Sequence, residues 1–388
     1  MMNRFYERLL FDTFERAIER GDITITAPGG ATRTFKGSVP GAKAIWQIHD
    51  WQVVKALASR GDIGLGETYT QGLWDSPDLD ALFTVFIDNL SRLDRFANGS
   101  ALSRAWLALV NNVIRRNSLR GSSRNIRAHY DVGNEFYKLW LDPTMTYSSA
   151  IYSGSEMTLQ DAQREKYQRI LSKIEEGRKH ILEIGCGWGG FAEEAARRGH
   201  RLTGLTLSHQ QYAYASERLK HQPADIRLQD YRETGGMFDA IASIEMFEAV
   251  GSRYWPSYFD TLKSRMAKDG VAMVQTITVG DEIFDDYAAR SDYIRHYVFP
   301  GGLLPSVARF RESAEKAGLA VKEVFAFGQD YARTLREWLA RFDASETAIR
   351  ALGYDSAFIR SWRLYLAMCA ASFACERTNV VQVELVHA

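Results

Sequence analysis

Residues 183–190 read EIGCGWGG, and this stretch decides the fold class. It completes the apolar run KHILEI, and Gly185, Gly187 and Gly190 have the G-x-G-x-x-G spacing of a turn between a strand and a helix that binds a nucleotide. Glycine allows the backbone to approach a ligand closely. The spacing alone is weak evidence, and it leaves open which ligand the turn holds.

Apolar runs alternate with helical or turn segments on both sides of this turn. Strand character is found at residues 179–184, 200–207, 225–230, 238–246 and 270–279, and the clearest helices are expected at 158–174 and 208–222. Such alternation predicts an α/β fold with a parallel, doubly wound sheet. Because ligands of these sheets bind at the carboxyl ends of the strands, the chemistry is expected there.

The composition excludes several classes of protein. The formal net charge is zero, so no overall basic field favours nucleic acid as a partner. Cys186, Cys369 and Cys375 are the three cysteines, and they form no C-x-x-C pair. This usage indicates a reducing compartment and argues against a disulfide scaffold and a zinc site. No metal site is predicted.

The sequence shows no signal peptide and no membrane-spanning run. The opening MMNRFYERLLFDTFERAIERGD carries charges every few positions and has no continuous apolar segment. A transmembrane helix needs about 18 or more apolar residues in succession, and no such run occurs. The expected location is therefore the cytoplasm.

We predict three parts along the chain, in keeping with its 388 residues. Residues 1–110 form a smaller, mainly helical domain. Within it, DITITAPGGATRTFKG at residues 22–37 alternates around a Pro-Gly-Gly turn and predicts a hairpin. Residues 111–128 form a linker, and residues 129–388 form the domain that carries the sheet.

The predicted linker is rich in arginine and has two interpretations. Its arginines are Arg115, Arg116, Arg120, Arg124 and Arg127. They lie among Ser, Asn and Gly, as in a solvated connector. They also follow the apolar AWLALV of a preceding helix, as in a basic strip that faces anionic lipid head groups. The residues alone leave both interpretations open.

The residues around the glycine turn indicate its ligand. A nicotinamide cofactor needs an acidic residue about 20 positions further on, and LTGLTLSHQQ around Leu205 contains none. Glu183 lies two residues before Gly185, where a carboxylate would repel a pyrophosphate. It would attract a cationic ligand such as S-adenosylmethionine, which carries an ammonium and a sulfonium. The turn is therefore predicted to bind a methyl donor.

Several further motifs carry a resemblance that runs from about His129 to the C-terminus. They are HYDVGNEFYKLWLDPTMTYSSA, LEIGCGWGGFA, GLTLSHQQ, QDYRE, FDAIASIEMFEAVG, YVFPGGLLPS and FGQDYARTLREWLARF. In this order they resemble the cyclopropane fatty acid synthase family, whose members use S-adenosylmethionine on the double bonds of acyl chains. The resemblance implies a Rossmann-like methyltransferase sheet for residues 129–388 and, more loosely, a lipid-docking role for residues 1–110.

The resemblance also implies which residues bind the cofactor. Tyr147 and Ser148 would contact the methionyl end, above Glu183, Gly185 and Gly187. The residues implied for the ribose and adenosine are Thr206 and Gln211, after the second strand, and Gln229 and Asp230, at the end of the third. All except the first pair lie at predicted strand ends.

The chemistry of such an enzyme sets requirements for the reacting centre. An alkene attacks an activated methyl group without a base, through proximity and alignment. The product is a carbocation, so water must be excluded, and ring closure then needs a base. In the family this base is a bound bicarbonate. The residues implied to hold it are Ser149, Glu248, Gln275, Ile277 through its backbone, and Tyr331.

Two of these residues depart from the common bacterial pattern of the family. Ser149 stands where the family usually has Cys, and Gln275 stands where many bacterial members have His and plant-type members have Gln. Both can still donate hydrogen bonds, but Gln cannot carry a charge. Glu248 is expected at the end of the fourth strand, with Gln275 and Ile277 in the fifth. These departures affect the step in which a base removes a proton before the ring closes.

Other candidates have both a structural and a functional interpretation. Cys369, in AMCAASF, matches a family cysteine suspected of catalysis, although its pattern favours a small buried residue on a helix. The aromatic residues Tyr287, Tyr293, Tyr297 and Phe299 are typical of packing, and they would also suit the wall of a substrate tunnel.

The resemblance implies an enzyme that adds a methylene group to unsaturated acyl chains of membrane phospholipids and forms cyclopropane fatty acids. One alternative stops before ring closure and gives methyl-branched unsaturated chains. A methyltransferase for soluble small molecules and a lipid-binding module without activity are further alternatives, and the later lipid-family motifs and the intact glycine turn argue against them. The enzyme would associate peripherally with the inner face of the membrane. A homodimer would let one subunit anchor while the other works.

Overall fold

The computed structural model describes residues 2–97, 132–174, 177 and 179–388. The predicted linker 111–128, its five arginines and the predicted boundaries at 110 and 129 all lie outside these residues. The division into three parts therefore stays a prediction.

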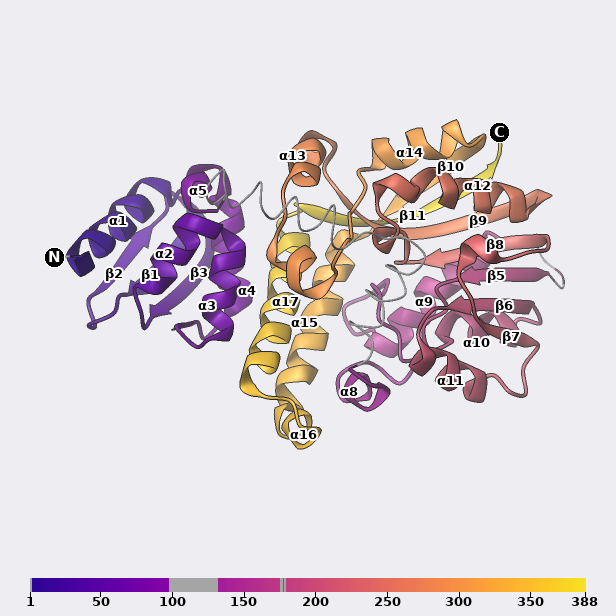
Figure 1. The fold of residues 1–388 in the computed structure, drawn as a ribbon, viewed down its shortest axis with the longest axis horizontal. Coiled ribbons are helices and arrows are strands. Elements are labelled where there is room, and N and C mark those ends of the chain that lie inside the picture. Colours follow the sequence, from indigo (N-terminus) through magenta and orange to yellow (C-terminus); the bar gives the residue numbers. More distant parts are fainter. Residues whose placement is uncertain (1, 98–131, 175–176, 178) are drawn as a thin grey trace.

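A seven-stranded sheet organises the larger part of the molecule, in the order β10-β11-β9-β8-β5-β6-β7 (Figure 1). Its strands are β5 (His180–Ile184), β6 (Arg201–Thr206), β7 (Ala224–Leu228), β8 (Phe238–Ile244), β9 (Met266–Val279), β10 (Leu319–Ala326) and β11 (Thr378–His387). Strands β5 to β9 run parallel, and β11 and β10 continue the sheet antiparallel. This confirms the predicted α/β class.

Both faces of the sheet are covered because alternate side chains of each strand point to opposite sides. Ile181 packs with α9 (Leu159–Ser172) and α10 (Gly190–Arg197). Its neighbour Leu182 belongs to the core on the other face, with α12 (Trp255–Arg265) and α14 (Val307–Lys316). Helix α11 (His209–Arg218) connects β6 to β7. Strands buried on both faces account for the continuous apolar runs in the sequence.

The chain leaves β5 on one side toward β6 and places β8 on the other side. Such a reversal of strand order opens a crevice at the carboxyl edge of the sheet, where ligands bind. Strands β5, β6, β7 and β8 end there at Ile184, Thr206, Leu228 and Ile244. The loops that follow these four strands therefore converge on one place.

The N-terminal domain has a second, smaller sheet in the order β2-β1-β3-β4. Its strands are β1 (Arg20–Thr26), β2 (Thr32–Lys36), β3 (Val39–Ile48) and β4 (Trp74–Asp75), and its helices are α1 (Met2–Ala17), α2 (Gln52–Arg60), α3 (Asp62–Thr70), α4 (Leu79–Asp88) and α5 (Leu90–Ala97). The predicted hairpin is confirmed, since Ile23 pairs with Phe35 across β1 and β2. Strand β3, parallel to β1, was not predicted.

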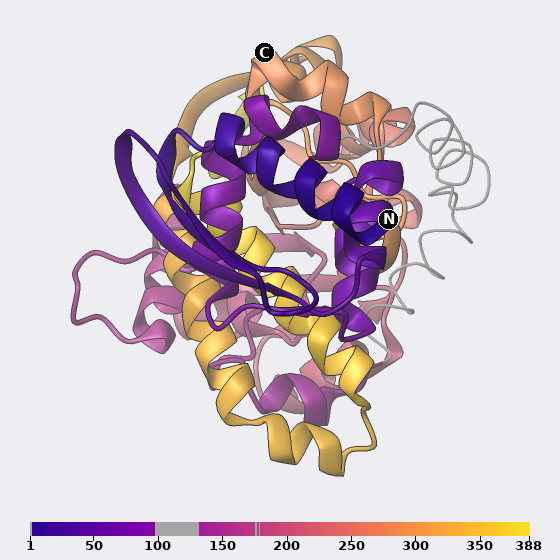
Figure 2. The same cartoon turned by 90° about the vertical axis from the view of Figure 1, so that its left-hand side faces the viewer.

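Two long helices of the larger part lie between the N-terminal elements and the seven-stranded sheet, α15 (Gly328–Ala344) and α17 (Ser356–Ala374) (Figures 1 and 2). Buried Leu364, Ala367 and Ala371 of α17 belong to the same core as the N-terminal helices. The Arg360 guanidinium donates to Trp74 O at 2.7 Å and pairs with the Asp75 carboxylate at 2.8 Å. Apolar packing and charged hydrogen bonds thus dock the two domains on each other.

The remaining α-helices of the described part are α8 (Asn134–Lys138), α13 (Phe284–Ala289) and α16 (Glu346–Ala351), and short 3₁₀ and π helices lie among the loops. Within the described ranges, no helix is long and apolar enough to cross a membrane.

Candidate active site

A polar cleft of about 150 Å³ lies at the carboxyl ends of the parallel strands. All nine residues predicted to bind the cofactor line it: Tyr147, Ser148, Glu183, Gly185, Gly187, Thr206, Gln211, Gln229 and Asp230. The structure therefore brings together residues that are up to 83 positions apart, from 147 to 230. We call this cavity the donor cleft.

The glycine turn gives the donor cleft its floor. Gly185 has φ +82°, and a Cβ there would lie 2.9 Å from Met246 Cγ. Gly187 has φ +51° and no heavy atom near its Cβ position, which leaves open space beside the backbone. The amides of Gly185 and Cys186 both donate to Leu205 O, at 3.0 and 2.8 Å. The bonds fix the turn against β6, and the missing side chains allow a ligand to approach the backbone.

Glu183 is a buried acidic residue at the floor of the donor cleft. It is 3% exposed, and its Oε2 has no hydrogen-bond partner among the residues that the structure describes. Burial raises the pKa of this carboxyl well above its ordinary value, against the opposing charges of Arg218 and Lys166. A buried carboxylate oxygen without a donor fits a ligand with a cationic end. The residues present therefore fit S-adenosylmethionine.

Hydrogen bonds hold the polar side chains of the cleft in place. Thr206 Oγ1 donates to Gln211 Oε1 at 2.8 Å across the start of α11. Asp230 Oδ2 accepts a hydrogen bond from Arg232 Nη2 at 2.7 Å, and the side-chain amide of Gln229 donates one to Glu233 O at 3.0 Å. These contacts order the side chains that follow β6 and β7 before any ligand binds.

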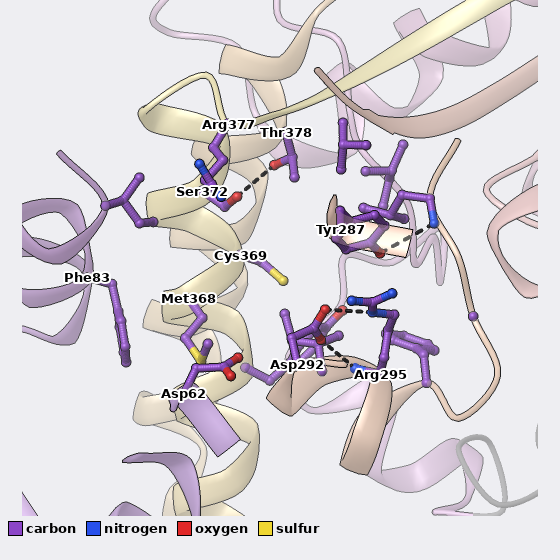
Figure 3. Close-up of a pocket in the computed structure, with 18 of the residues that line it drawn as sticks. Asp62, Phe83, Tyr287, Asp292, Arg295, Met368, Cys369, Ser372, Arg377 and Thr378 are labelled. Atoms are coloured by element: carbon purple, nitrogen blue, oxygen red, sulfur yellow. Dashed lines mark hydrogen bonds and ion pairs between the residues drawn. The ribbon is translucent and has the colours of Figure 1, made fainter. Parts of the chain in front are cut away.

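A second, larger cavity of about 490 Å³ lies between the two domains. Its apolar walls include Phe83 and Phe86 from the N-terminal domain, Tyr287 from the helix Phe284–Ala289, Phe299 from the segment after that helix, and Met368 from α17. Figure 3 shows Cys369 pointing from α17 toward the segment with Tyr287, Asp292 and Arg295, while Phe83 lies on the N-terminal side. We call this cavity the acyl cavity.

A small charged group interrupts the apolar wall of the acyl cavity. Arg295 Nε pairs with Asp292 Oδ2 at 2.7 Å, as Figure 3 shows. Asp62 Oδ2 accepts from the Tyr293 amide at 3.0 Å. Burial, followed by the charge of Asp292, raises the pKa of Asp62 to about 7. No group of three or more metal-ligating side chains occurs in the described part of the chain.

The two cavities share a wall made of three residues, Tyr147, Glu245 and Ala249. Glu245 directly follows the last residue of β8 and has φ +50°, in the left-handed region. Its amide donates to Gln275 O at 2.8 Å. A residue with a Cβ adopts this conformation only when its surroundings enforce it, and such residues cluster at functional sites.

Three donors converge on the Glu245 carboxylate. The Ser149 amide donates to Oε1 at 2.8 Å and Gln275 Nε2 donates to Oε1 at 2.7 Å. The Tyr331 hydroxyl donates to Oε2 at 2.6 Å. Gln382 Nε2 in turn donates to Gln275 Oε1 at 3.0 Å, which sets the orientation of the Gln275 amide. Glu245 is thus a central residue of the site, and it was not among the predicted ones.

Glu248 lies elsewhere than predicted. Strand β8 ends at Ile244, and Glu248 falls in the short 3₁₀ helix Phe247–Ala249 beyond it. Gln275 and Ile277 lie in β9, as predicted, and Glu248 Oε1 accepts from the Ile277 amide at 2.5 Å. Burial, followed by the charge of Glu245, raises the pKa of Glu248 to about 8.

The predicted bicarbonate site needs correction. Ser149, Gln275 and Tyr331 donate to Glu245, and Ile277 donates to Glu248. The donors implied for a bound anion are therefore used by carboxylates of the chain itself. A bicarbonate does not fit this arrangement, because it would find these donors taken and two buried carboxyl groups beside it.

Lys166 is a second buried titratable residue beside the site that the sequence analysis missed. It is fully buried, and its Nζ donates to Ser148 Oγ at 2.5 Å. Burial lowers its pKa to about 7, against the charges of Glu245, Asp142 and Glu183. A signal existed in the predicted helix 158–174, because Lys166 shares the buried face of α9 with Leu159 and Ile170. A lysine on an apolar helix face is unusual enough to mark a site.

Cys369 and the predicted aromatic residues divide between the cavity and the packing around it. Cys369 lines the acyl cavity, and burial raises the pKa of its thiol well above the ordinary value. Tyr287 and Phe299 also line it. Tyr293 instead packs against Gly66, and Tyr297 is 47% exposed.

The chain is similar to proteins of one known family over most of its length. The family described as mycolic acid cyclopropane synthetase matches residues 117–383. The cyclopropane-fatty-acyl-phospholipid synthase of Escherichia coli is 32% identical over 365 residues, covering 90% of this chain and 88% of that protein. The chain belongs to this family. It is an S-adenosylmethionine-dependent methyltransferase, and the predicted family is confirmed.

The proteins similar to this chain include a fatty acid methyltransferase as well as cyclopropane synthases. The tuberculostearic acid methyltransferase UfaA1 of Mycobacterium tuberculosis is 34% identical over 353 residues, covering 86% of this chain and 81% of that protein. The solved structure of mycolic acid cyclopropane synthase CmaA1 complexed with SAH and CTAB is 30% identical, with a TM-score of 0.64, and covers 68% of this chain and 97% of CmaA1. The family thus joins cyclopropane synthases and fatty acid methyltransferases that depend on S-adenosylmethionine.

Proposed function

We propose that this enzyme transfers a methylene group from S-adenosylmethionine to the cis double bond of unsaturated acyl chains of membrane phospholipids and forms cyclopropane fatty acids. The observation that carries the proposal is the wall shared by the two cavities, where Tyr147, Glu245 and Ala249 face both. A polar site for a methyl donor and an apolar site for a long chain meet there and nowhere else in the described part.

The donor cleft would hold the cofactor in one orientation. When bound, S-adenosylmethionine supplies an activated methyl group to a nucleophilic carbon. The unpaired Oε2 of Glu183 would bind its cationic methionyl end. The Thr206 and Gln211 pair would bind the ribose region, and Gln229 and Asp230 the adenosine. Tyr147, which would contact the methionyl end, lines both the donor cleft and the acyl cavity.

The acyl cavity would align the double bond and exclude water. An alkene is a weak nucleophile, so proximity supplies most of the rate of methyl transfer. A positive charge then forms on the acyl chain, and aromatic rings such as Tyr147 and Tyr331 can stabilise it. The Tyr147 hydroxyl donates to the Tyr365 hydroxyl at 3.0 Å, which holds the ring in position.

Because α2 to α5 contribute walls of the acyl cavity, the N-terminal domain would take part in lipid binding. We propose that this domain docks on the membrane surface from the cytoplasmic side, so that an acyl chain of a phospholipid passes between the domains. A homodimer in which one subunit anchors the other is a further part of this proposal. Sedimentation of the protein with and without lipid vesicles tests both parts.

A second candidate function is C-methylation without ring closure. It is favoured by the similarity to the methyltransferase UfaA1, which at 34% identity is comparable to the 32% shared with the Escherichia coli cyclopropane synthase. In this reaction the cation on the chain loses a proton from a chain carbon, and a double bond remains.

The proposal is tested by incubating the purified enzyme with vesicles of a monounsaturated phospholipid and S-adenosylmethionine that carries a trideuterated methyl group. Mass spectrometry of the released acyl chains gives the result. Retention of two deuterium atoms in a saturated, ring-containing chain supports cyclopropanation. Retention of three deuterium atoms in a chain that still has a double bond supports C-methylation without ring closure. An unlabelled lipid in the presence of bound cofactor contradicts both.

A further inference from the structure

We propose that the Glu245 carboxylate is the base of this enzyme and takes the place that a bicarbonate has in the family resemblance. The inference rests on the proposed function, since it names the group that accepts the proton after methyl transfer. It concerns both product types, because each requires one proton to leave the substrate.

The first support is the set of donors around Glu245. Ser149 N, Gln275 Nε2 and the Tyr331 hydroxyl lie 2.8, 2.7 and 2.6 Å from its oxygens. They belong to three of the residues implied to bind the exogenous anion, although Ser149 contributes its backbone amide. They come from the segment before α9, from β9 and from α15, so folding of the whole domain assembles an anion site around Glu245. The chain fills that site with its own carboxylate.

The second support is position. Glu245 lines both the donor cleft and the acyl cavity, whereas Ser149 and Gln275 are fully buried and line neither. Of the carboxylates that the structure describes, Glu245 is the only one on the shared wall. A base for this reaction must face the added methyl group while the acyl chain is bound. Ser149 and Gln275 are positioning residues that act through Glu245.

The third support is the backbone. Three described residues other than glycine have positive φ, and Glu245 is one of them at +50°. Another is Met145, which lines the donor cleft. A disfavoured backbone conformation at the wall of a site is typical of a side chain that is placed for function.

Burial raises the pKa of both carboxyl groups of the site, and nearby charges act on them in opposite directions. Burial raises the pKa of Glu245, while Lys166 and the three donors oppose this and stabilise the carboxylate form. The neighbouring Glu248 has its pKa raised to about 8, so it holds its proton at neutral pH. The cation Lys166 and three hydrogen-bond donors surround Glu245, whereas at Glu248 the charge of Glu245 adds to the effect of burial.

The proton transfer balances without a further reactant. After methyl transfer, a C–H bond of the added methyl group breaks, its electron pair forms the second carbon–carbon bond of the ring, and the proton passes to a Glu245 oxygen. If the C–H bond of a neighbouring chain carbon breaks instead, the pair becomes a double bond and the same oxygen takes the proton. Glu245 releases it to solvent after the product leaves.

The experiment compares the dependence of turnover on bicarbonate in three proteins: the wild type, Glu245→Gly and the control Glu315→Gln, whose side chain is exposed on α14. Glycine suits the φ of +50° at position 245, so the backbone can stay as it is. In buffer freed of carbon dioxide we expect equal rates for wild type and control, with and without added bicarbonate. We expect Glu245→Gly to lose about 100-fold or more and to recover in part with bicarbonate.

A wild-type rate that falls about tenfold without bicarbonate and returns when it is added would overturn the proposal. A readout that does not depend on turnover is the NMR line width of ¹³C-labelled bicarbonate. We expect the bicarbonate signal to broaden when Glu245→Gly is added and to stay sharp with the wild type. A signal broadened by the wild type would contradict the inference. Calorimetric titration with S-adenosylmethionine shows that the variant is folded. If no lipid is modified by any of the proteins, the proposed function fails, and the bicarbonate binding still decides the role of Glu245.

Discussion

The donor cleft and the acyl cavity of this enzyme are built in different ways. Most residues of the donor cleft follow β5, β6 and β7 in the chain, within residues 183–232. The walls of the acyl cavity come from residues as distant as Phe14 and Thr378 and from both domains. Local turns after strands form the first cavity, while the docking of two domains forms the second.

This difference means that the two cavities can be disturbed separately. A change in the docking of the domains should weaken lipid turnover and leave cofactor binding intact. A change at the strand ends should weaken cofactor binding first. Calorimetric titration with S-adenosylmethionine reports on the donor cleft, and turnover on phospholipid vesicles reports on both cavities.

The largest effect is expected from filling the acyl cavity. Met368 lies on α17, lines the cavity and contacts the N-terminal core. In Met368→Trp the larger side chain occupies the space of the acyl chain, and a misplacement of the reacting carbon by about 1 Å costs about 100-fold in rate. We expect this loss in turnover and a cofactor affinity within about twofold of wild type. Met237→Trp, at a position that is 58% exposed, is the control. If cofactor binding in Met368→Trp fell as much as turnover, the two cavities could not be disturbed separately.

The next effect concerns the donor cleft. Glu183→Gln keeps the shape of the side chain and removes the negative charge that the cationic ligand needs. A hydrogen bond to a charged group contributes about 1.5–3 kcal/mol, so the affinity for S-adenosylmethionine should fall about 10- to 100-fold. Titration calorimetry measures this loss, and Glu315→Gln is again the matched control. An unchanged affinity would show that Glu183 does not face the ligand.

The same comparison explains how much the sequence could predict. The glycine turn and the residues after β6 and β7 stand in contiguous motifs, and all nine predicted cofactor residues line one cleft. Their roles as ligands of the cofactor stay predictions. The acyl cavity could not be predicted from residue patterns, because its walls depend on how α3 and α4 dock on α17. Strands β10 and β11 were also missed; β11 is inserted antiparallel between β9 and β10, so it breaks the parallel pattern that the sequence predicted.

Glu245 and Lys166 were missed for a different reason. Glu245 stood inside the predicted strand run 238–246, and only the end of β8 at Ile244 releases it into the site. Its role depends on Ser149 and Gln275, which are 96 and 30 residues away in the chain. Lys166 was concealed in a helix that was predicted correctly. Sequence reasoning therefore named Glu248 and the residues that donate to Glu245, but it did not name Glu245 itself.

A smaller effect is expected where the domains meet. Gly66 in α3 lies against the Tyr293 ring, and a Cβ at this position would fall 2.2 Å from Tyr293 Cδ2. Gly66→Ala should push α3 away from the wall of the acyl cavity and lower the turnover about tenfold, with a destabilisation of about 1–3 kcal/mol. Cofactor affinity should not change. Gly154→Ala, which meets no atom within 4 Å, is the control. Wild-type turnover in Gly66→Ala would contradict the role of domain docking.

The acidic pair predicts a pH dependence of stability. Glu248 has its pKa raised from 4.5 to about 8 in the folded state, so between these values the folded chain holds a proton that the unfolded chain has lost. The free energy of unfolding should therefore fall as the pH rises from about 4.5 to about 8, by at most about 1.4 kcal/mol per pH unit from this group. Glu248→Gln should lessen this slope in unfolding by urea. A slope equal to that of the wild type would show that Glu248 ionises normally.

The smallest effect is expected at Cys369, and it separates a wall residue from a nucleophile. The thiol lines the acyl cavity, but burial raises its pKa well above the ordinary value, so it stays protonated at neutral pH. A protonated thiol is a poor nucleophile and is a small apolar surface toward an acyl chain. Cys369→Ser keeps the size of the side chain and should change turnover by less than about threefold, because the step it would have to assist belongs to other groups. A loss of about 100-fold with unchanged cofactor affinity would instead give the thiol a chemical role. It would also move the reacting centre from the shared wall at Glu245 toward α17.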